Sequence, residues 1–145
     1  MHYLLTGHTG FKGTWLVALL KSRGHKVSGI SLAPEANSIF TRGSFKELVE
    51  NDYYLDIRNR EELLNAVSLI KPDAVIHLAA QPLVRQSYIE PISTFQSNIM
   101  GTAYILEAIQ NTESIKAGLI ITTDKVYKNI NKEDGYCEND SLGGY

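Results

Sequence analysis

TGHTGFKG, residues 6–13, follows a short apolar run at the start of the chain and leads directly into a second apolar run, TWLVALL. Its glycines, Gly7, Gly10 and Gly13, recur at every third position, and Lys12 lies between the last two. A glycine-rich turn between a strand and a helix lets backbone N–H groups approach an anion, because a helix N-terminus has unpaired donors and a partial positive charge. The stretch therefore predicts the first strand, turn and helix of a dinucleotide-binding α/β fold.

Each glycine has its own expected role in such a turn. Gly7 would form the turn itself, Gly10 would admit a phosphate closely, and Gly13 would let the helix pack against the strand. The spacing differs from the common Gly-x-Gly-x-x-Gly pattern, so the prediction depends on the position of the stretch between a strand and a helix. Lys12 is compatible with two roles, a solvated side chain at a helix start or a cation near the phosphates of a ligand.

The composition is that of a globular protein of one domain. The chain has 145 residues, of which 43% are hydrophobic and 21% are charged, and its formal net charge is −2. This charge gives no reason to expect nucleic acid or an anionic membrane as a partner. The apolar runs are too short to cross a membrane and no secretion leader precedes them, so we expect a cytoplasmic protein. The single cysteine, Cys137, is expected to be an inert surface thiol.

Short apolar runs alternate with helical patterns along the chain. Parallel strands need a crossover connection, so this alternation favours an α/β fold with a doubly wound parallel sheet. The runs at 74–79 and 118–122 are almost continuously apolar, which is typical of central strands buried on both faces. The expected strands are 2–6, 26–31, 53–57, 74–79 and 118–122, and the expected helices are 14–23, 40–50, 60–70 and 92–110, with a polar loop over 127–145.

The residue that ends the second expected strand bears on the choice of cofactor. An acidic side chain at this position binds the adenosine ribose hydroxyls of NAD. Here the strand ends in Ser31, and Glu35 comes several residues later, so the sequence leaves NAD and NADP both open. Asp56, at the end of the third expected strand, could bond the adenine amino group or could serve as a turn or cap residue.

Several motifs together carry a resemblance to a known family. They are TGHTGFKG at 6–13, HLAAQPLVRQSY at 77–88, NIMGT at 98–102, TTDKVY at 122–127 and LGGY at 142–145. In this order they resemble the extended short-chain dehydrogenase/reductases, and within that family they look most like the CDP-glucose 4,6-dehydratases. The resemblance covers the whole chain. It implies a Rossmann-type fold, and it explains Lys12, because a lysine between the glycines is habitual in that subfamily.

The resemblance also implies a reaction. Such enzymes hold NAD tightly, oxidise C4 of the glucose unit, eliminate water across C5 and C6, and return the hydride to C6. By position in TTDK, Thr123 would hydrogen-bond the C4 oxygen, Asp124 would protonate the departing C6 hydroxyl, and Lys125 would remove the C5 proton. The alternative for Asp124 and Lys125 is an ordinary solvated pair in a loop. The sequence alone does not exclude NADP as the cofactor.

The resemblance assigns further residues to the cofactor and the substrate. Arg85 and Ser87 match positions near the substrate, as does Gln81, and Asn98 either contacts the cofactor or braces backbone between a strand and a helix. His77 is expected to be a core histidine with satisfied hydrogen bonds, and the four histidines show no metal-ligand spacing. The implied cofactor-binding residues are Gly7, Thr9, Gly10, Phe11, Lys12, Gly13, Ser31, Asp56, Ile57, Leu78, Ala79, Ala80 and Asn98.

The chain departs from the family at its end. The family's catalytic Tyr-x-x-x-Lys segment comes just downstream of LGGY, and Tyr145 matches an earlier tyrosine of that segment. We therefore expect residues 1–145 to be a NAD(P)-binding Rossmann domain with about five strands, truncated before the later strands and the small substrate domain. We expect such a part to be inactive alone and to associate as a homodimer through its uncovered surfaces.

Two further hypotheses remain open from the sequence. One is another enzyme of the same kind, a GDP-mannose or dTDP-glucose 4,6-dehydratase or a nucleotide-sugar epimerase. An epimerase would not need the acid and base of Asp124 and Lys125. The other hypothesis is a dinucleotide-binding module without catalysis.

Overall fold

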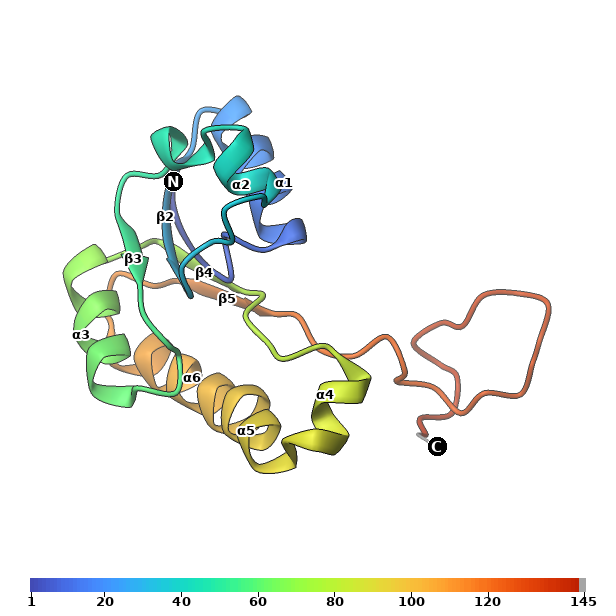
Figure 1. Ribbon diagram of the computed structural model, residues 1–145. Helices are drawn as coiled ribbons and strands as arrows, with labels where there is room; N and C mark the ends of the chain where they lie inside the picture. Colours follow the sequence, from blue (N-terminus) through green and yellow to red (C-terminus); the bar gives the residue numbers. More distant parts are fainter. Residues whose placement is uncertain (144–145) are drawn as a thin grey trace.

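The structure is a computed structural model and describes residues 1–143. Its centre is a five-stranded parallel sheet with the strand order β3-β2-β1-β4-β5. Helices α1 and α2 cover one face of this sheet, and α3, α5 and α6 cover the other (Figure 1). This is the doubly wound, Rossmann-like α/β fold that the alternation of strands and helices predicts. The strands are β1 His2–Thr6, β2 Lys26–Ser31, β3 Asp52–Tyr54, β4 Ala74–His77 and β5 Ala117–Ile120.

Alternating residues of the strands build a hydrophobic core on each face of the sheet. On one face, Leu4, Ile30 and Val75 pack with the buried side of α3 and α6. On the other, Leu5 and Val27 pack with the buried side of α1. Neighbouring residues of a strand point to opposite faces, so the interior strands β2, β1 and β4 contribute buried residues to both cores.

The helices begin and end where local chemistry favours it. Asn59 caps α3, since its side chain accepts a hydrogen bond from the backbone N–H of Glu62, and Lys71 ends that helix in a left-handed conformation with φ of 48°. The region 40–50 forms two short helices rather than one, because Ser44 between them has φ of 54°. The helices are α1 Phe11–Ser22, α2 Ile39–Arg42, η1 Phe45–Leu48, α3 Arg60–Ile70, α4 Val84–Ile89, α5 Pro91–Phe95, η2 Gln96–Gly101 and α6 Thr102–Asn111.

The predicted helix 92–110 is present, but its middle is wound as a π-helix. The backbone stays helical from α5 through η2 into α6, because Phe95, Gly101 and Thr102 all have right-handed helical angles. Helix α4, before it, has no counterpart in the sequence-based expectation. Its pattern is hidden because none of its side chains is buried.

Three strand predictions need correction. The third strand ends at Tyr54 rather than at 57. Strand β4 ends at His77 rather than at 79, because the N–H of Ala79 donates to the hydroxyl of Thr6 and not to a backbone carbonyl. The strand predicted at 118–122 is not central. Among the described residues β5 pairs only with β4, and Leu119 is 54% exposed.

The segment after β5 extends away from the sheet as a long arm (Figure 1). Over residues 127–143 it has no helix or strand, as the polar sequence predicts, and a single antiparallel bridge joins Tyr127 to Leu142. Tyr136 stacks on Tyr127 with ring centroids 5.6 Å apart. Tyr145, which the resemblance places before the catalytic tyrosine, lies outside the described residues.

Candidate functional site

The residues singled out in the sequence gather at one edge of the sheet. All strands of the sheet run parallel, so their carboxyl ends meet at the same edge, where doubly wound folds bind their ligands. The glycine loop follows β1, Ser31 ends β2, Asp56 follows β3, and residues 78–81 follow β4. Residues 123–125 follow β5. Arg85 and Ser87 lie beyond this edge, on α4, where Ser87 donates a hydrogen bond to the carbonyl of Val84 and Arg85 is exposed.

The glycine loop is packed so closely that it tolerates no side chain at two positions. Gly7 has φ of 73°, and a Cβ on it would lie 2.9 Å from the backbone nitrogen of Ala79. A Cβ on Gly13, in the first turn of α1, would overlap the carbonyl oxygen of Gly7 and the Cα of His8. Gly13 therefore lets the first turn of α1 pack against the backbone of the glycine loop, and not only against the strand as expected.

The N-terminus of α1 has the properties of an anion site. Its cap residue, Gly10, supplies no side-chain hydrogen bond, and the first turn contains no acidic residue. The partial positive charge of the helix is therefore not offset by this chain's own side chains. Phe11 and Lys12 in that turn are both exposed. The residues fit a dinucleotide, because a pyrophosphate placed here would meet backbone donors and no opposing carboxylate.

Ser31 stands where an acidic residue would bind a ribose, and its hydrogen-bond direction is determined. The hydroxyl of Thr9 donates to the carbonyl of Leu32 over 3.1 Å and lies 2.6 Å from the hydroxyl of Ser31. Thr9 has one hydroxyl hydrogen, so Ser31 must donate to Thr9. The free lone pair of the Ser31 oxygen can accept a hydrogen bond, but Ser31 has no second hydrogen to donate.

Asp56 is engaged by a neighbour in this structure. The guanidinium of Arg58 binds both carboxylate oxygens at 2.6–3.0 Å and also reaches the hydroxyl of Ser93 on α5. These hydrogen bonds from Arg58 lower the pKa of Asp56. Ile57 turns inward, is 7% exposed and packs against Gly101, so it presents only its backbone to the edge of the sheet.

The segment Leu78–Gln81 is held at both ends by side chains of other elements. At its start, the Thr6 hydroxyl accepts the N–H groups of Leu78 and Ala79, each over 3.2 Å. At its end, the Asn98 amide accepts from the backbone nitrogen of Gln81 over 2.8 Å and donates to its carbonyl over 3.0 Å. These contacts are those of the bracing alternative for Asn98, and its contact with the cofactor stays a prediction.

Residues 123–125 begin the arm after β5, and their side chains are exposed among the described residues. The backbone nitrogen of Lys125 donates to the hydroxyl of Thr123 over 3.1 Å. The chain still follows β4 just before them, since the backbone nitrogen of Ile121 donates to the carbonyl of His77. The segment 123–125 therefore follows β5, the neighbour of strand β4, which leads into the segment Leu78–Gln81.

A buried cluster beneath the glycine loop is a feature that the sequence reasoning missed. His8 is fully buried, its Nε2 lies 2.8 Å from a carboxylate oxygen of Asp52, and its ring packs edge-on against Phe40 and parallel to Tyr54. The ring fits because the facing residue of β2 is Gly29, where a Cβ would overlap it. A histidine inside the loop, with a glycine in the next strand, is a signal that could have revealed the cluster.

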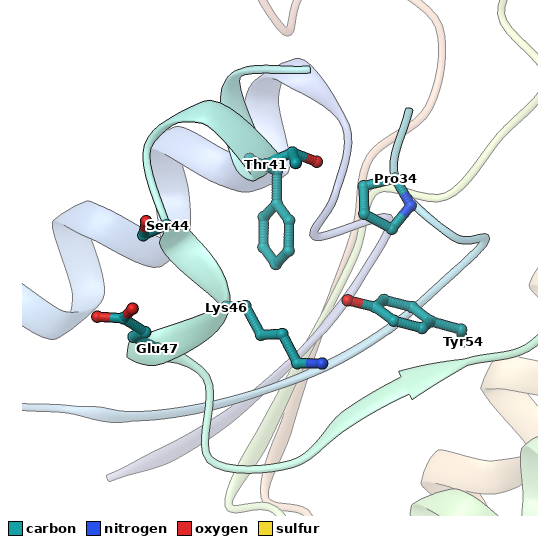
Figure 2. A pocket seen from close by; sticks show the side chains of 7 residues that line it. Pro34, Thr41, Ser44, Lys46, Glu47 and Tyr54 are labelled. Carbon is teal, nitrogen blue, oxygen red and sulfur yellow. The ribbon is translucent and has the colours of Figure 1, made fainter. Parts of the chain in front are cut away.

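Burial dominates the titration of this cluster. Desolvation lowers the pKa of His8, and desolvation together with the Asp52 carboxylate raises the pKa of Tyr54 to about 12. Above the cluster lies a cavity of about 530 Å³, into which Tyr54 and Lys46 point (Figure 2). Its lining is completed by Pro34, Phe40, Thr41, Ser44 and Glu47.

His77 is the satisfied core histidine that the sequence predicts. It is 1% exposed, and both ring nitrogens have hydroxyl partners, Thr6 and Thr102. Burial lowers the pKa of His77 to about 4. Within residues 1–143, no three His, Cys, Asp or Glu side chains come together as metal ligands, and no helix is long and apolar enough to span a membrane.

Comparison with known proteins agrees with this architecture. The family model described as GDP-mannose 4,6 dehydratase matches residues 4–142. The chain belongs to this family of nucleotide-sugar 4,6-dehydratases. The family member CDP-glucose 4,6-dehydratase of Salmonella typhimurium is 46% identical over 142 residues, which cover 97% of this chain and 39% of the relative. The dTDP-D-glucose 4,6-dehydratase of Dictyostelium discoideum is 34% identical, over 96% of this chain and 32% of the relative. The chain thus spans about two-fifths or less of the length of these dehydratases.

Solved structures show the same fold. Pal from Bacillus thuringiensis superposes with a TM-score of 0.84 at 26% identity, over 99% of this dehydratase-family chain and 45% of Pal. UDP-glucose-4-epimerase from Stenotrophomonas maltophila, solved with NAD and formylated UDP-arabinopyranose, has a TM-score of 0.81 at 26% identity, over 99% and 43%. The NAD complex of the Thermus thermophilus UDP-glucose 4-epimerase has a TM-score of 0.80 at 26% identity, over 99% and 45%.

Proposed function

We propose that this chain is the cofactor-binding part of a NAD-dependent nucleotide-sugar 4,6-dehydratase that converts CDP-glucose to CDP-4-keto-6-deoxyglucose. The observation that carries the proposal is the order of elements at the ligand edge. The glycine loop after β1 and residues 123–125 after β5 lie on the two sides of the segment 78–81 after β4. The 46% identity to the Salmonella typhimurium enzyme supports CDP-glucose as the substrate. In this proposal residues 1–145 form one NAD(P)-binding domain.

The cofactor is proposed to be NAD. When bound, NAD supplies an acceptor for the C4 hydride and a donor that returns it to C6. The uncapped N-terminus of α1 would bind its pyrophosphate, and Ser31 would accept a hydrogen bond from an adenosine ribose hydroxyl. Ser31 supports NAD over NADP, because an oxygen with no hydrogen to donate is a poor partner for a 2′-phosphate. The backbone of Leu78–Ala80 would contact the cofactor, and Asn98 would act by holding Gln81.

The chain's own residues would carry the elimination of water. The hydroxyl of Thr123 would hydrogen-bond the oxygen on C4 of the sugar and orient it. Lys125 would take the proton from C5, and Asp124 would donate a proton to the C6 oxygen as the C6–O bond breaks, so that water leaves. Arg85, Ser87 and Gln81 would bind the substrate. Of these, Gln81 already hydrogen-bonds Leu83 and Thr94 within the chain, which keeps its side chain close to α5.

Replacing Asp124 with asparagine in the whole protein tests the division of roles. Asp124→Asn keeps the size of the side chain but removes the proton donor. The variant is expected to reduce the bound nucleotide on mixing with CDP-glucose, and to form no 6-deoxy product detectable by mass spectrometry. Equal loss of both steps would overturn the role of Asp124. Full activity of the variant would likewise overturn that role, whereas a whole protein that forms only sugar epimers, or no product at all, would favour an epimerase or a non-catalytic dinucleotide-binding module.

The substrate is tested by offering CDP-glucose, dTDP-glucose and GDP-mannose at equal concentration. We expect conversion of CDP-glucose at least tenfold faster than the other two, which corresponds to about 1.4 kcal/mol in transition-state binding. Preference for another sugar nucleotide would correct the substrate and leave the class of enzyme intact.

The 145-residue chain alone is proposed to be inactive. Its sequence contains no tyrosine followed four positions later by lysine, the pair that the family uses to start oxidation at C4. Incubation of the purified chain with NAD and CDP-glucose should therefore leave the sugar unchanged by mass spectrometry. Formation of any 4-keto-6-deoxy sugar would contradict this part of the proposal.

Homodimerisation and a cytoplasmic location complete the proposal. Apolar side chains on α4, α5 and η2 are exposed, among them Tyr88 at 83%, Ile92 at 69% and Phe95 at 59%. Exposed apolar side chains on consecutive helices favour association. Light scattering should give twice the mass of one chain, and a monomer at micromolar concentration would contradict it. The exposed lone thiol of Cys137 is compatible with a reducing compartment, which cell fractionation tests.

A further inference from the structure

The hydroxyl of Thr6 makes as many hydrogen bonds as its chemistry allows. Thr6 is the last residue of β1 and is fully buried. Its oxygen accepts the N–H groups of Leu78 and Ala79 over 3.2 Å each, and it lies 2.6 Å from Nδ1 of His77. The N–H of Leu78 is shared with the backbone carbonyl of Thr6, so the direction of the bond to His77 follows from the other ring nitrogen. Thr102 donates its one hydroxyl hydrogen to the carbonyl of Asn98 and can only accept from Nε2 of His77, which leaves Nδ1 to accept from Thr6. Nδ1 of His77 is therefore an acceptor and carries no hydrogen.

The tautomer of His77 follows from this direction. A neutral imidazole with an accepting Nδ1 carries its hydrogen on Nε2, which lies 3.0 Å from the hydroxyl of Thr102. Thr102 accepts this hydrogen bond and donates its own hydrogen to the carbonyl of Asn98 over 2.9 Å. The low pKa of His77 agrees with a neutral ring at physiological pH. Each hydrogen bond from Thr6 through His77 and Thr102 to Asn98 thus has an assigned donor and acceptor.

The chain of hydrogen bonds closes on itself. Asn98, which receives the hydrogen bond of Thr102 at its carbonyl, holds both backbone groups of Gln81 with its side chain. From Gln81 the backbone leads back to Ala79 and Leu78, whose N–H groups return to Thr6. The circuit therefore joins β1, β4 and the π-helical η2. It encloses the strand-end segment that the proposed function assigns to the cofactor.

The circuit also touches the glycine loop. Gly7 directly follows Thr6 and approaches Ala79 so closely that a Cβ on Gly7 would lie 2.9 Å from the nitrogen of Ala79. A shift of the segment 78–81 would therefore open or obstruct the space beside the loop. An apolar residue in place of His77 could fill the same volume in the core, but it could not tie Thr6 to Thr102.

We propose that His77 is a positioning residue that, through Thr6 and Thr102, holds the segment Leu78–Gln81 against the glycine loop in the geometry that binds the dinucleotide. The inference rests on the proposed function and goes beyond it, since neither Thr102 nor His77 is among the residues proposed to contact the cofactor or the substrate. It explains why a strand that is otherwise apolar contains a histidine.

The test uses a matched pair of substitutions at Thr102. Thr102→Val keeps the shape but removes the hydroxyl, and Thr102→Ser keeps the hydroxyl. Loss of one hydroxyl link in a buried circuit is expected to weaken NAD binding about tenfold in Thr102→Val, measured by calorimetric titration, while Thr102→Ser stays within about twofold of the unsubstituted chain. His77→Phe, which removes both links, is expected to weaken binding at least as much as Thr102→Val.

Two further readouts separate positioning from stability alone. Amide hydrogen exchange at Leu78, Ala79 and Gln81 should accelerate selectively in Thr102→Val, and the nitrogen NMR spectrum of the unsubstituted chain should show the Nε2–H tautomer of His77. Unchanged NAD affinity in Thr102→Val and His77→Phe, with only a lower melting temperature, would overturn the inference and leave the proposed function intact. Failure of the unsubstituted chain to bind NAD would overturn both.

Discussion

The two sides of the candidate site differ in how firmly the chain itself holds them. The start of the glycine loop is held by several elements, by Gly29 and Asp52 through the ring of His8, by Ile30 through the N–H of Gly7, and by Ala79. The segment 123–125 lies at the start of the arm, next to an edge strand, with its three side chains exposed among the described residues.

This difference shows that binding a ligand and transferring protons place different demands on the fold. A site for the invariant part of a ligand, such as a pyrophosphate, can be built by one βαβ unit with close packing and free helix N–H groups. Groups that move protons need a defined environment as well as a position, and an edge strand alone provides only the position. Substitutions on the two sides should therefore differ strongly in their effect on folding and on NAD binding.

The largest expected effect is at Gly13. In Gly13→Ala the new Cβ would overlap the backbone of Gly7 and His8, and neither backbone can move without opening the loop. We expect a loss of more than about 3 kcal/mol in the free energy of unfolding, measured by urea denaturation. The control is Gly135→Ala in the arm, where a Cβ meets nothing within 4 Å and a change within about 0.5 kcal/mol is expected. Equal effects of the two substitutions would abolish the contrast between loop and arm.

The second-largest effect is expected from acid pH, which should lower the free energy of unfolding. The pKa of His77 falls from 6.5 to about 4 in the folded chain, so below pH 6.5 the unfolded chain binds a proton that the folded chain does not. Stability is therefore present above pH 6.5 and declines as the pH falls toward 4, by up to about 3 kcal/mol in total. Buried His8, whose pKa is also lowered, adds to the decline in the same direction.

Urea denaturation at a series of pH values measures this decline. The variant His77→Phe should show a shallower slope between pH 6.5 and 4, with the part contributed by His8 retained. An unchanged slope in His77→Phe would show that another group is responsible.

A smaller effect is expected at Gly29. In Gly29→Ala the methyl group would overlap the ring of His8, which Phe40, Tyr54 and Asp52 hold in place. We expect a loss of about 2 kcal/mol in the free energy of unfolding. Combining it with His8→Ala should recover part of the loss relative to the sum of the two single changes, because the second change removes the overlapping ring. Strict additivity in this double-mutant cycle would contradict the packing described for His8.

The smallest effect is expected in the arm, at Tyr136. Its hydroxyl donates to the side-chain carbonyl of Asn129 and accepts from the backbone nitrogen of Ile130. Tyr136→Phe should change the free energy of unfolding of the sheet by less than about 0.5 kcal/mol, and should speed hydrogen exchange at Ile130. A cooperative loss of stability of 2 kcal/mol or more would show that arm and sheet fold as one unit.

Local patterns in the sequence were sufficient to predict β1, β2 and α3 with their bounds, because each has its own periodicity and flanking signals. They did not predict that β5 has only one neighbouring strand among the described residues, because an apolar run looks the same whether its strand pairs on one side or on both. The ends of β3 and β4 also escaped prediction. For β4 this is because the end is determined by a side chain 71 residues away in the sequence, the hydroxyl of Thr6.

The glycine loop shows what the sequence by itself determined about this protein. Gly7, Gly10 and Gly13 between two apolar runs predict a strand, a tight turn and a helix N-terminus, and at Gly7 and Gly13 a side chain would overlap neighbouring backbone. The tertiary structure decided the rest. It placed the side-chain amide of Asn98 on the backbone of Gln81, set the ring of His8 over Gly29, and joined Thr6, His77 and Thr102 in one direction of hydrogen bonding. Such contacts join residues distant in sequence, and their geometry exists only once the sheet and its two layers of helices have packed.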